Sequence, residues 1–306
     1  VVSSTINYRD VLTDGEDVLL ASNEEQWFES LESFIKDRSS RERIGEKAMS
    51  KALAEYSIES LGQSLVSNID KVLNVQKKKN KKKVAIVNVF FPPQAIGGAT
   101  RVVIDNLEVL EQQYGEEFEV VVFTSDNHQR VPHKLSVYQY KGVTIYRATV
   151  LRRDDIDWHY RDDVMGDLFR KFIELEEPDL IHFHCVQRLT ASVVLAAKEE
   201  RIPYMITIHD AWWISDHQFL VDAHHHVYRD GHPDILESRS LPYGISLGDS
   251  VGRLLFLKEL LQGAKTLLTV SEKFADIYRK NGIEDILVNK NGLGSSVKWK
   301  PKDTSY

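Results

Sequence analysis

The sequence is poor in cysteine, with Cys185 as the only thiol among 306 residues. One thiol excludes an intrachain disulfide, so we expect a reducing compartment and a cytoplasmic protein. No apolar run approaches the roughly 20 residues that a membrane-spanning helix needs, and no signal peptide is visible. The net charge of −7 gives no reason to expect nucleic acid as a partner.

Several sequence signatures of catalysis and cofactor binding are also missing. The chain has neither a GxGxxG fingerprint nor a P-loop. These absences disfavour a nicotinamide-dependent oxidoreductase.

The composition that is present is ordinary for a globular protein, with 42% apolar and 28% charged residues. The length suits two domains or one large one. The sharpest boundary is KKKNKKK, residues 77–83. Such a charge block usually forms a solvated linker. Peripheral contact with an anionic membrane, at the inner membrane face, is the alternative.

Residues 1–76 are expected to form a small, mainly helical segment. A short strand is expected at residues 17–21, and Asn23 is a suitable N-cap for the helix that follows. Further helices are expected over residues 39–56 and from Ser57 onward. One clear strand in so short a segment makes a thin core, so we do not expect this segment to fold alone.

After the linker, expected strands and helices alternate. Nearly all-apolar strands such as YMITI indicate burial on both faces of a parallel sheet. The order predicts an α/β fold with a doubly wound, mostly parallel Rossmann-like sheet. Strands are expected at residues 84–90, 119–124, 144–147, 180–183, 204–209, 266–270 and, more weakly, 286–288. Helices are expected at residues 99–113, 161–174, 189–200, 250–261 and 272–281.

The segment FPPQAIGGATRVV, residues 91–103, follows the first of these buried strands. Gly97 and Gly98 let backbone N–H groups approach a ligand without interference from Cβ atoms, and the start of the following helix favours negative charge. Ligands of open parallel sheets bind at the carboxyl ends of the strands. The pattern therefore predicts a loop that contacts phosphate or sugar at this edge.

Histidines end two of the expected strands. His209, followed by Asp210, closes YMITI and should face the crevice, where it would hydrogen-bond a sugar hydroxyl or act in acid–base chemistry. A histidine satisfied by neighbouring backbone is the alternative. His182 and His184 alternate along IHFHC, and we expect them on opposite faces of the strand. His184, nearer the strand tip, is the candidate for ligand contact, and His182 the candidate for packing.

Other clusters allow two interpretations. We interpret the irregular stretch 215–250 as a flap near the strand ends. The histidine run 224–226 suggests zinc, but matching ligands are missing nearby, so we expect no metal. The acidic residues between 154 and 163 resemble a metal cluster only superficially, and a solvated face is expected. Cys185 is expected to serve packing.

Four aromatic residues fall in a probable loop: Trp212, Trp213, Phe219 and Tyr228. They would either stack on a sugar ring or form the hydrophobic floor beneath the loop, and the sequence does not separate these interpretations.

Several segments resemble, in order, one known group of enzymes. FFPPQAIGGATRVV, PDLIHFHC, ITIHDAWW, LLTVSEKFADIYRKNGI and the closing NKNGL resemble the N-terminal half of retaining GT-B-type glycosyltransferases. The group is the sucrose-synthase-like and mannosyltransferase-like family. The resemblance covers about residues 84–295.

Residues 1–73 resemble the opposite end of such a module. VVSSTINYRDVLTDGEDVLLA is similar to its C-terminal stretch, and DRSSRERIGEKAMSKALAEYS to the helical tail that follows. We therefore expect the tail of one module in residues 1–76, the linker in 77–83, an acceptor-side domain in 84–295 and the start of an interdomain linker in 296–306. A tandem two-transferase polypeptide or a circular permutation would give this order.

The resemblance implies transfer of a sugar from a nucleotide-sugar to a glycan or lipid-linked hydroxyl acceptor, with retention. It implies polysaccharide or cell-envelope glycan synthesis and no metal or other cofactor. Gly97 and Gly98 would approach the donor phosphates, and Trp212 and Trp213 would border the acceptor cleft. His209 would be the catalytic residue near the transferred sugar.

Asp210 follows the histidine, as in the family's HD pair, and is taken as a substrate-binding residue. Ser271 and Glu272 match an SE pair after a strand, but Ser271 is also a good N-cap. No copy of the family's nucleotide-sugar site, a basic pair with two glutamates, is found. We therefore expect that the donor half is missing and that the chain alone is inactive. A non-catalytic α/β module that binds a glycan or a partner is the alternative.

Overall fold

The computed structural model describes residues 1–73, 81–94, 96–127, 131–222, 224–229, 241–242 and 244–292. The chain divides into two compact units, Val1–Leu61 and Gly62–Asn291. Some expectations fall outside the described residues: part of the lysine-rich linker (77–80), part of the flap (230–240) and the interdomain linker (296–306). Among the described helices, none is long and apolar enough to cross a bilayer.

The smaller unit is mainly helical, as expected. Its elements are β1 (Val2–Ser3), α1 (Ile6–Arg9), β2 (Leu20–Ala21), α2 (Glu24–Lys36) and α3 (Arg38–Tyr56), and α4 (Ile58–Leu73) begins in it. Strands β1 and β2 pair in parallel. Asn23 caps α2, because its side chain accepts a hydrogen bond from Gln26 N at 2.9 Å. Among the described residues of this unit, the buried apolar side chains are Val18, Ala21 and Ile44, which make a thin core.

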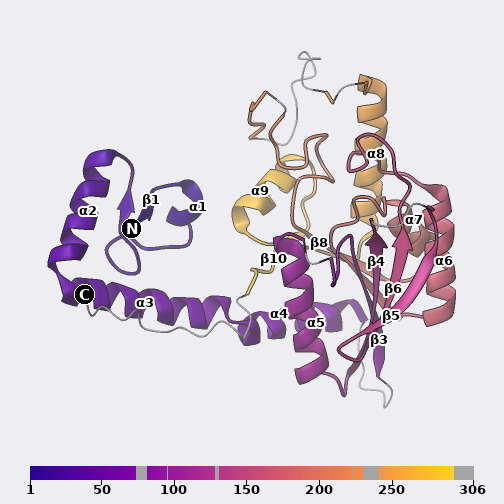
Figure 1. The fold of residues 1–306 in the computed structure, drawn as a ribbon, viewed down its shortest axis with the longest axis horizontal. Coiled ribbons are helices and arrows are strands. Elements are labelled where there is room, and N and C mark those ends of the chain that lie inside the picture. Colours follow the sequence, from indigo (N-terminus) through magenta and orange to yellow (C-terminus); the bar gives the residue numbers. More distant parts are fainter. Residues whose placement is uncertain are drawn as a thin grey trace. The chain divides into compact units, whose positions relative to one another are not determined.

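The larger unit contains an eight-stranded sheet in the order β10-β9-β8-β7-β3-β4-β6-β5 (Figure 1). In chain order its elements after α4 are β3 (Lys82–Asn88), α5 (Gly98–Gln113), β4 (Phe118–Asp126), β5 (Leu135–Tyr140), β6 (Val143–Thr149), α6 (Asp163–Glu176), β7 (Leu180–Phe183), α7 (Ser192–Glu199), β8 (Tyr204–Ile208), α8 (Leu247–Gly263), β9 (Thr266–Thr269), α9 (Glu272–Lys280) and β10 (Ile286–Val288). Neighbouring strands are parallel except at the edge, where β5 pairs antiparallel with β6. The predicted mostly parallel, doubly wound fold is confirmed. Only the half-exposed edge strand β5 was not expected.

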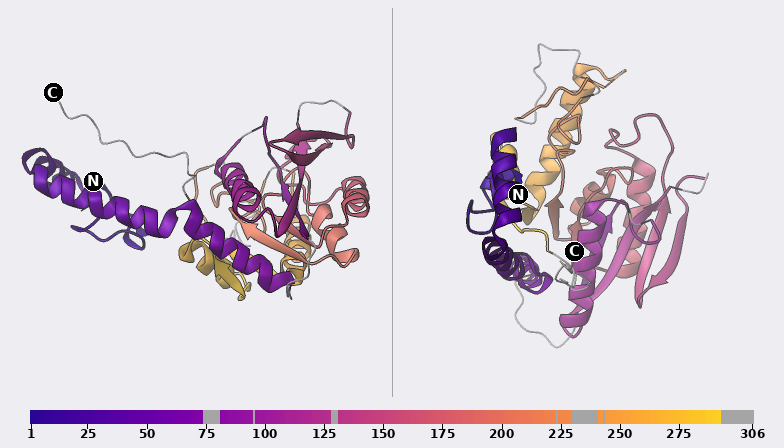
Figure 2. Two further views of the ribbon diagram at one scale, coloured as in Figure 1. Left: turned by 90° about the horizontal axis from the view of Figure 1, so that it is seen from below. Right: turned by 60° about the vertical axis from the view of Figure 1, so that its left-hand side comes forward.

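Both faces of the sheet are covered by helices (Figures 1 and 2). Successive residues of a strand point to opposite faces. In β3, Val84 and Ile86 pack in the core that includes α4 and α5, whereas Ala85 and Val87 pack in the core that includes α6, α7 and α8. Burial on both faces explains why the strands are almost entirely apolar.

The domain boundary lies earlier in the chain than the lysine-rich segment suggested. Leu65, Val66 and Ile69 of α4 are buried in the same core as β3 and α5. The larger unit therefore begins at Gly62, inside a helix that the sequence had placed in the N-terminal segment. The burial of this apolar helix face, and not the lysine-rich segment that follows it, sets the domain boundary.

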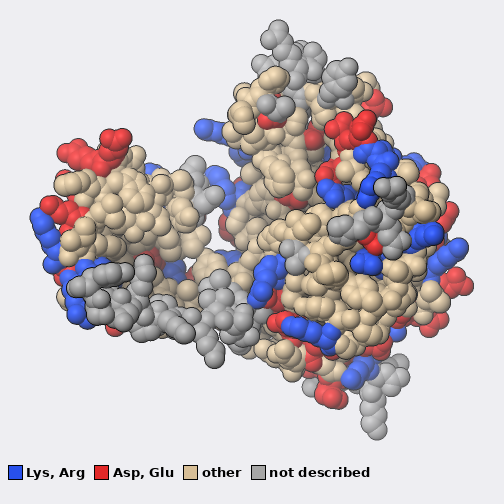
Figure 3. Space-filling view, in the orientation of Figure 1, with Lys and Arg blue, Asp and Glu red and all other residues tan. Residues whose placement is uncertain are grey.

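The expected linker is wrong at its last residues, because Lys82 and Lys83 belong to β3. Lys82 Nζ lies 2.7 Å from Asp179 Oδ1, and Lys83 Nζ lies 3.0 Å from Glu176 Oε2. These ion pairs stabilise the two lysine side chains at the start of β3. On the face of this unit shown in Figure 3, basic and acidic side chains are interspersed.

The contact between α4 and α5 can be tested at Gly62. A Cβ at this position would lie 2.6 Å from Val109 Cγ1, closer than real Cβ atoms approach. Gly62→Ala should therefore lower the free energy of unfolding by about 1–3 kcal/mol. Gly252 of α8 is the control, since a Cβ there meets nothing within 4 Å. Gly252→Ala should raise stability by up to about 1 kcal/mol. Urea denaturation measures both variants, and equal stabilities would contradict the contact.

Candidate functional site

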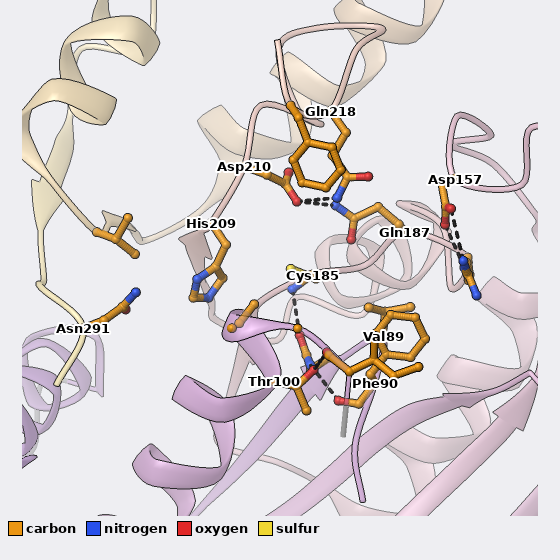
Figure 4. A pocket seen from close by; sticks show the side chains of 18 residues that line it. Val89, Phe90, Thr100, Asp157, Cys185, Gln187, His209, Asp210, Gln218 and Asn291 are labelled. Carbon is orange, nitrogen blue, oxygen red and sulfur yellow. Dashed lines mark hydrogen bonds and ion pairs between the residues drawn. The ribbon is translucent and has the colours of Figure 1, made fainter. Parts of the chain in front are cut away.

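A cavity of about 530 Å³ opens at the carboxyl edge of the sheet (Figure 4). It lies where the strand order reverses, since β3 has β4 on one side and β7 on the other. Chain segments that leave neighbouring strands in opposite directions leave a crevice at such a point. Its walls come from the ends of β3, β7 and β8 and from the start of α5. The sequence predicted this edge as the binding site.

The paired glycines form one wall of the cavity. Gly97 has φ 83° and ψ 163° and stands at the N-cap position of α5, with no side-chain cap, and Gly98 begins the helix. A left-handed φ explains glycine at position 97. A Cβ built at either residue meets nothing within 4 Å. The free N–H groups at the start of the helix are therefore accessible and carry the positive end of its dipole.

Asn88, which the sequence analysis overlooked, joins the loops around the cavity. Its Oδ1 accepts a hydrogen bond from Cys185 N at 3.1 Å. Its Nδ2 donates to Phe90 O at 2.7 Å and to Thr100 Oγ1 at 3.3 Å. One buried amide thus fixes the end of β3, the end of β7 and the first turn of α5. Its position at the end of a buried strand was the available signal.

His209 lines the cavity and is backed by His184. His184 Nδ1 lies 2.9 Å from His209 Nε2, and the two rings stack with centroids 5.2 Å apart. His184 is itself buried and does not line the cavity, so its predicted contact with a ligand is corrected to a supporting position. The bond to His184 leaves His209 Nδ1 as the ring nitrogen for a ligand.

The expectation that His182 and His184 lie on opposite faces is wrong. Residues two apart in a strand share a face. Their ring centroids lie 4.1 Å apart, and His182 Nε2 lies 2.8 Å from Thr207 Oγ1. Three imidazoles therefore form a row from the interior to the cavity.

Burial keeps this row of imidazoles uncharged. It lowers the pKa of His182 to about 3 and the pKa of His209 to about 4. The pKa of His184 also lies well below its ordinary value, because of burial and its two imidazole neighbours. At neutral pH His209 is thus a hydrogen-bonding group rather than a proton donor, which favours orientation of a ligand over acid catalysis.

Asp210 is a fixed carboxylate in the cavity wall. Its Oδ1 accepts from Trp212 N at 3.0 Å, and its Oδ2 accepts from Gln187 Nε2 at 3.0 Å and Gln218 Nε2 at 2.7 Å. Burial raises the pKa of Asp210, and these hydrogen bonds act in the opposite direction. All three hydrogen bonds are donated to the carboxylate and favour its ionised form. Asp210 therefore holds Trp212, Gln187 and Gln218 in place.

Arg188 and Asp157 form an ion pair at another side of the cavity. Arg188 Nε lies 2.7 Å from Asp157 Oδ1, and Nη2 lies 3.2 Å from Oδ2. The guanidinium also lies over the ring of Phe90, 5.2 Å from its centroid. Asp157 was expected on a solvated face. No local sequence pattern indicated this pair, because its members are 31 positions apart.

Trp212 and Trp213 do not border the cavity. They are 1% and 3% exposed, and they belong to the core on the α6–α8 side of the sheet. Of the two interpretations, the structure places them as the floor beneath the loop. Phe219 instead lines the cavity and is 76% exposed. Tyr228 is buried against His217, with rings stacked 5.2 Å apart.

Arg253 of α8 holds the loop that carries Asp210. It is fully buried, with the guanidinium 4.9 Å from the ring centroid of Trp212 and 5.7 Å from that of Trp158. It donates to the carbonyls of Trp158 (3.0 Å), Ser215 (3.1 Å) and Trp212 (2.7 Å). Burial lowers the pKa of Arg253 to about 10, so the side chain remains a cation at neutral pH.

The remaining candidates lie elsewhere or serve local structure. The histidine run 224–226 is exposed, and among the described residues no group of three or more His, Cys, Asp or Glu could hold a metal ion. Ser271 caps α9 by accepting from Phe274 N at 3.3 Å, as its sequence context suggested. Cys185 lines the cavity, but burial raises the pKa of its thiol well above the ordinary value, so the thiolate is disfavoured.

The buried imidazoles should make the fold sensitive to acid. Because the folded pKa values lie near 3 to 4 and the unfolded value near 6.5, the unfolded chain binds more protons in that interval. The free energy of unfolding should fall as the pH decreases from about 6.5 to about 4, by up to about 1.4 kcal/mol per pH unit for each imidazole. His182→Gln should reduce this slope by about one proton, and His224→Gln, at an exposed imidazole, should not. Urea denaturation at several pH values across this range measures the slope of the unfolding free energy against pH. Equal slopes for the wild type and His182→Gln would refute the burial of a neutral imidazole at this position.

Arg253→Met should leave three buried carbonyls without donors. We expect a loss of about 3 kcal/mol or more in the free energy of unfolding. Arg253→Lys keeps the charge but reaches fewer acceptors, so an intermediate loss is expected. Arg161→Met, at an exposed arginine, is the control and should change stability by less than about 0.5 kcal/mol. Chemical denaturation measures all three; a stability of Arg253→Met equal to that of the control would contradict the proposed anchor.

Comparisons with known proteins bear on the same region. Residues 97–292 match a family model described as "Glycosyl transferase 4-like domain". No curated protein sequence matches the chain.

Similar solved structures include one described as "OtsA apo structure", at 13% identity and a TM-score of 0.40, over 66% of this chain and 43% of that chain. An α,α-trehalose-phosphate synthase (UDP-forming) from Burkholderia vietnamiensis is 15% identical, with a TM-score of 0.38, over 69% of this chain and 48% of that chain. An α,α-trehalose 6-phosphate synthase from Burkholderia multivorans is 15% identical, with a TM-score of 0.35, over 66% and 43%. The chain spans less than half the length of each of these structures.

The family match covers most of the chain and includes Gly97, Gly98, His209 and Asp210, which all line the cavity. The chain therefore belongs to the glycosyl transferase 4-like domain family.

Proposed function

We propose that the chain is part of a retaining glycosyltransferase that moves a sugar from a nucleotide-sugar to a hydroxyl acceptor. The supporting observation is one cavity, in a chain of this family, that joins an open helix start to an uncharged histidine. The proposal includes the sucrose-synthase-like and mannosyltransferase-like subtype and a role in polysaccharide or cell-envelope glycan synthesis.

In this proposal the helix start of α5 binds the diphosphate of the donor. Gly97 and Gly98 line the cavity at a helix start without a capping side chain, and the helix dipole favours an anion there. Arg188 adds a cation to the same cavity. Such groups stabilise the negative charge that develops on a leaving phosphate. We therefore propose that no metal is required.

His209 would orient the transferred sugar. The hydrogen bond to His184 fixes its ring, and its low pKa keeps it neutral, so Nδ1 remains for a sugar hydroxyl. A neutral imidazole held in this orientation positions the sugar and contributes no charge.

The carboxylates of the cavity argue against a covalent intermediate on the protein. Among the described residues that line it, the acidic side chains are Asp157 and Asp210. Asp157 is paired with Arg188, and Asp210 accepts three hydrogen bonds. Neither carboxylate is free to attack the sugar. Attack by the acceptor hydroxyl on the face from which the phosphate departs agrees with this arrangement.

Gly98→Ala tests the phosphate contact. The new methyl group would stand in open space beside the helix start, so the fold should be unaffected while ligand approach is hindered. We expect calorimetry to show binding of UDP or GDP to the wild-type chain and at least tenfold weaker binding to Gly98→Ala. Gly252→Ala is the control and should bind like the wild type. Failure of the wild type to bind either nucleotide, both as this chain and in the full polypeptide, would refute the proposal and favour a non-catalytic glycan-binding module.

A further inference from the structure

Asp210 sets the orientation of two glutamine side chains in the cavity. Gln187 and Gln218 both direct their amide nitrogens to the same carboxylate oxygen, at 3.0 Å and 2.7 Å. An ionised carboxylate only accepts hydrogen bonds, so this contact fixes which end of each amide faces it. Figure 4 shows that the amide oxygens of both residues turn away from Asp210.

The two amide oxygens are acceptors without donors. Both glutamines line the cavity, and the described residues donate no hydrogen bond to either amide oxygen. Neither oxygen is among the buried side-chain atoms that lack a partner, so both remain accessible. The cavity therefore presents two fixed carbonyl acceptors, whereas the start of α5 presents donors.

The orientation of these acceptors is held by several further contacts. Ala211 N donates to Gln218 O at 2.9 Å, which closes the loop on itself. Tyr278 Oη donates to Asp210 O at 2.8 Å. Arg253 binds the carbonyls of Trp212 and Ser215 in the same loop. The acceptors are thus set in place before a ligand arrives.

An apolar surface lies beside the acceptors. Phe219 follows Gln218 directly, lines the cavity and is 76% exposed. An exposed aromatic ring beside fixed polar groups suits a ligand with one apolar face and polar edges. A pyranose has this character, because its C–H groups lie on the ring faces and its hydroxyls at the rim.

We propose that Gln187, Gln218 and Phe219 form a pyranose-binding subsite in the cavity. The amide oxygens accept hydrogen bonds from two ring hydroxyls, and Phe219 packs on a C–H face. Asp210 is a positioning residue that orients both amides. The assignment of this pyranose to a transfer reaction rests on the proposed function. The ring belongs either to the acceptor or to the donor sugar.

The subsite is tested by a cycle of protein and ligand changes. Methyl α-D-gluco-, manno- and galactopyranoside are titrated into the chain by saturation-transfer NMR, and then the monodeoxy analogues of the tightest ligand. In the wild type, loss of each bonded hydroxyl should weaken binding about fivefold. In Gln218→Met, the parent glycoside should bind about fivefold more weakly, and one deoxy penalty should vanish. In Gln187→Met, the penalty for a different missing hydroxyl should vanish. This variant provides the test if Gln218→Met fails to fold.

Gln139→Met is the matched control, since Gln139 lies on the edge strand β5, outside the cavity. It should leave every affinity unchanged. Absence of glycoside binding by the wild type would overturn the subsite. Deoxy penalties that persist in both glutamine variants would overturn it too, even if the glycosides bind.

Nucleotide binding separates this inference from the proposed function. UDP or GDP binding without glycoside binding would refute the subsite alone. Glycoside binding without nucleotide binding, both in this chain and in the full polypeptide, would uphold the subsite and refute the transferase. Displacement of the glycoside by a nucleotide-sugar but not by its nucleotide assigns the ring to the donor, and simultaneous binding assigns it to the acceptor; both results support the subsite.

Discussion

The buried guanidinium of Arg253 is the contact on which both walls of the cavity depend. It lies over the rings of Trp158 and Trp212 and donates to three backbone carbonyls. One of these carbonyls belongs to Trp158, directly after Asp157 of the ion pair, and another to Trp212, whose N–H binds Asp210. The indole of Trp212 also donates to the Asp157 carbonyl. A single buried cation thus ties together two loops that are distant in sequence. Burying it is favourable only because its donors are satisfied.

The polar groups of the cavity fall into two sets, hydrogen-bond donors and hydrogen-bond acceptors. At the start of α5 the backbone offers donors and partial positive charge, while Gln187 and Gln218 offer acceptors. His209 completes the lining with a neutral imidazole. A ligand that is anionic at one end and rich in hydroxyls at the other matches this division. Every charged group in this lining is paired or hydrogen-bonded within the protein, which keeps the geometry fixed.

The sequence predicted the sheet, the glycine loop and the histidine at a strand end, because each depends on local pattern. Apolar runs mark strands buried on both faces, and the carboxyl edge of the sheet follows from their order. The role of Arg253 was not predictable, since its acceptors are backbone carbonyls whose positions depend on the fold. Trp212 and Trp213 were misjudged for a related reason: a tryptophan in a loop sequence gives no information on which side of the loop is core. Residues 65–69 were assigned to the wrong domain, because the lysine run was a more conspicuous signal than the packing of a helix.

We propose that one cavity at the strand-order reversal binds both phosphate and sugar. A crystal structure of the chain with UDP or GDP and a methyl glycoside tests it most directly. We expect a phosphate oxygen within hydrogen-bond distance of the Gly98 N–H, and ring hydroxyls on the amide oxygens of Gln187 and Gln218. A nucleotide bound elsewhere on the chain, with this cavity holding only water, would contradict it.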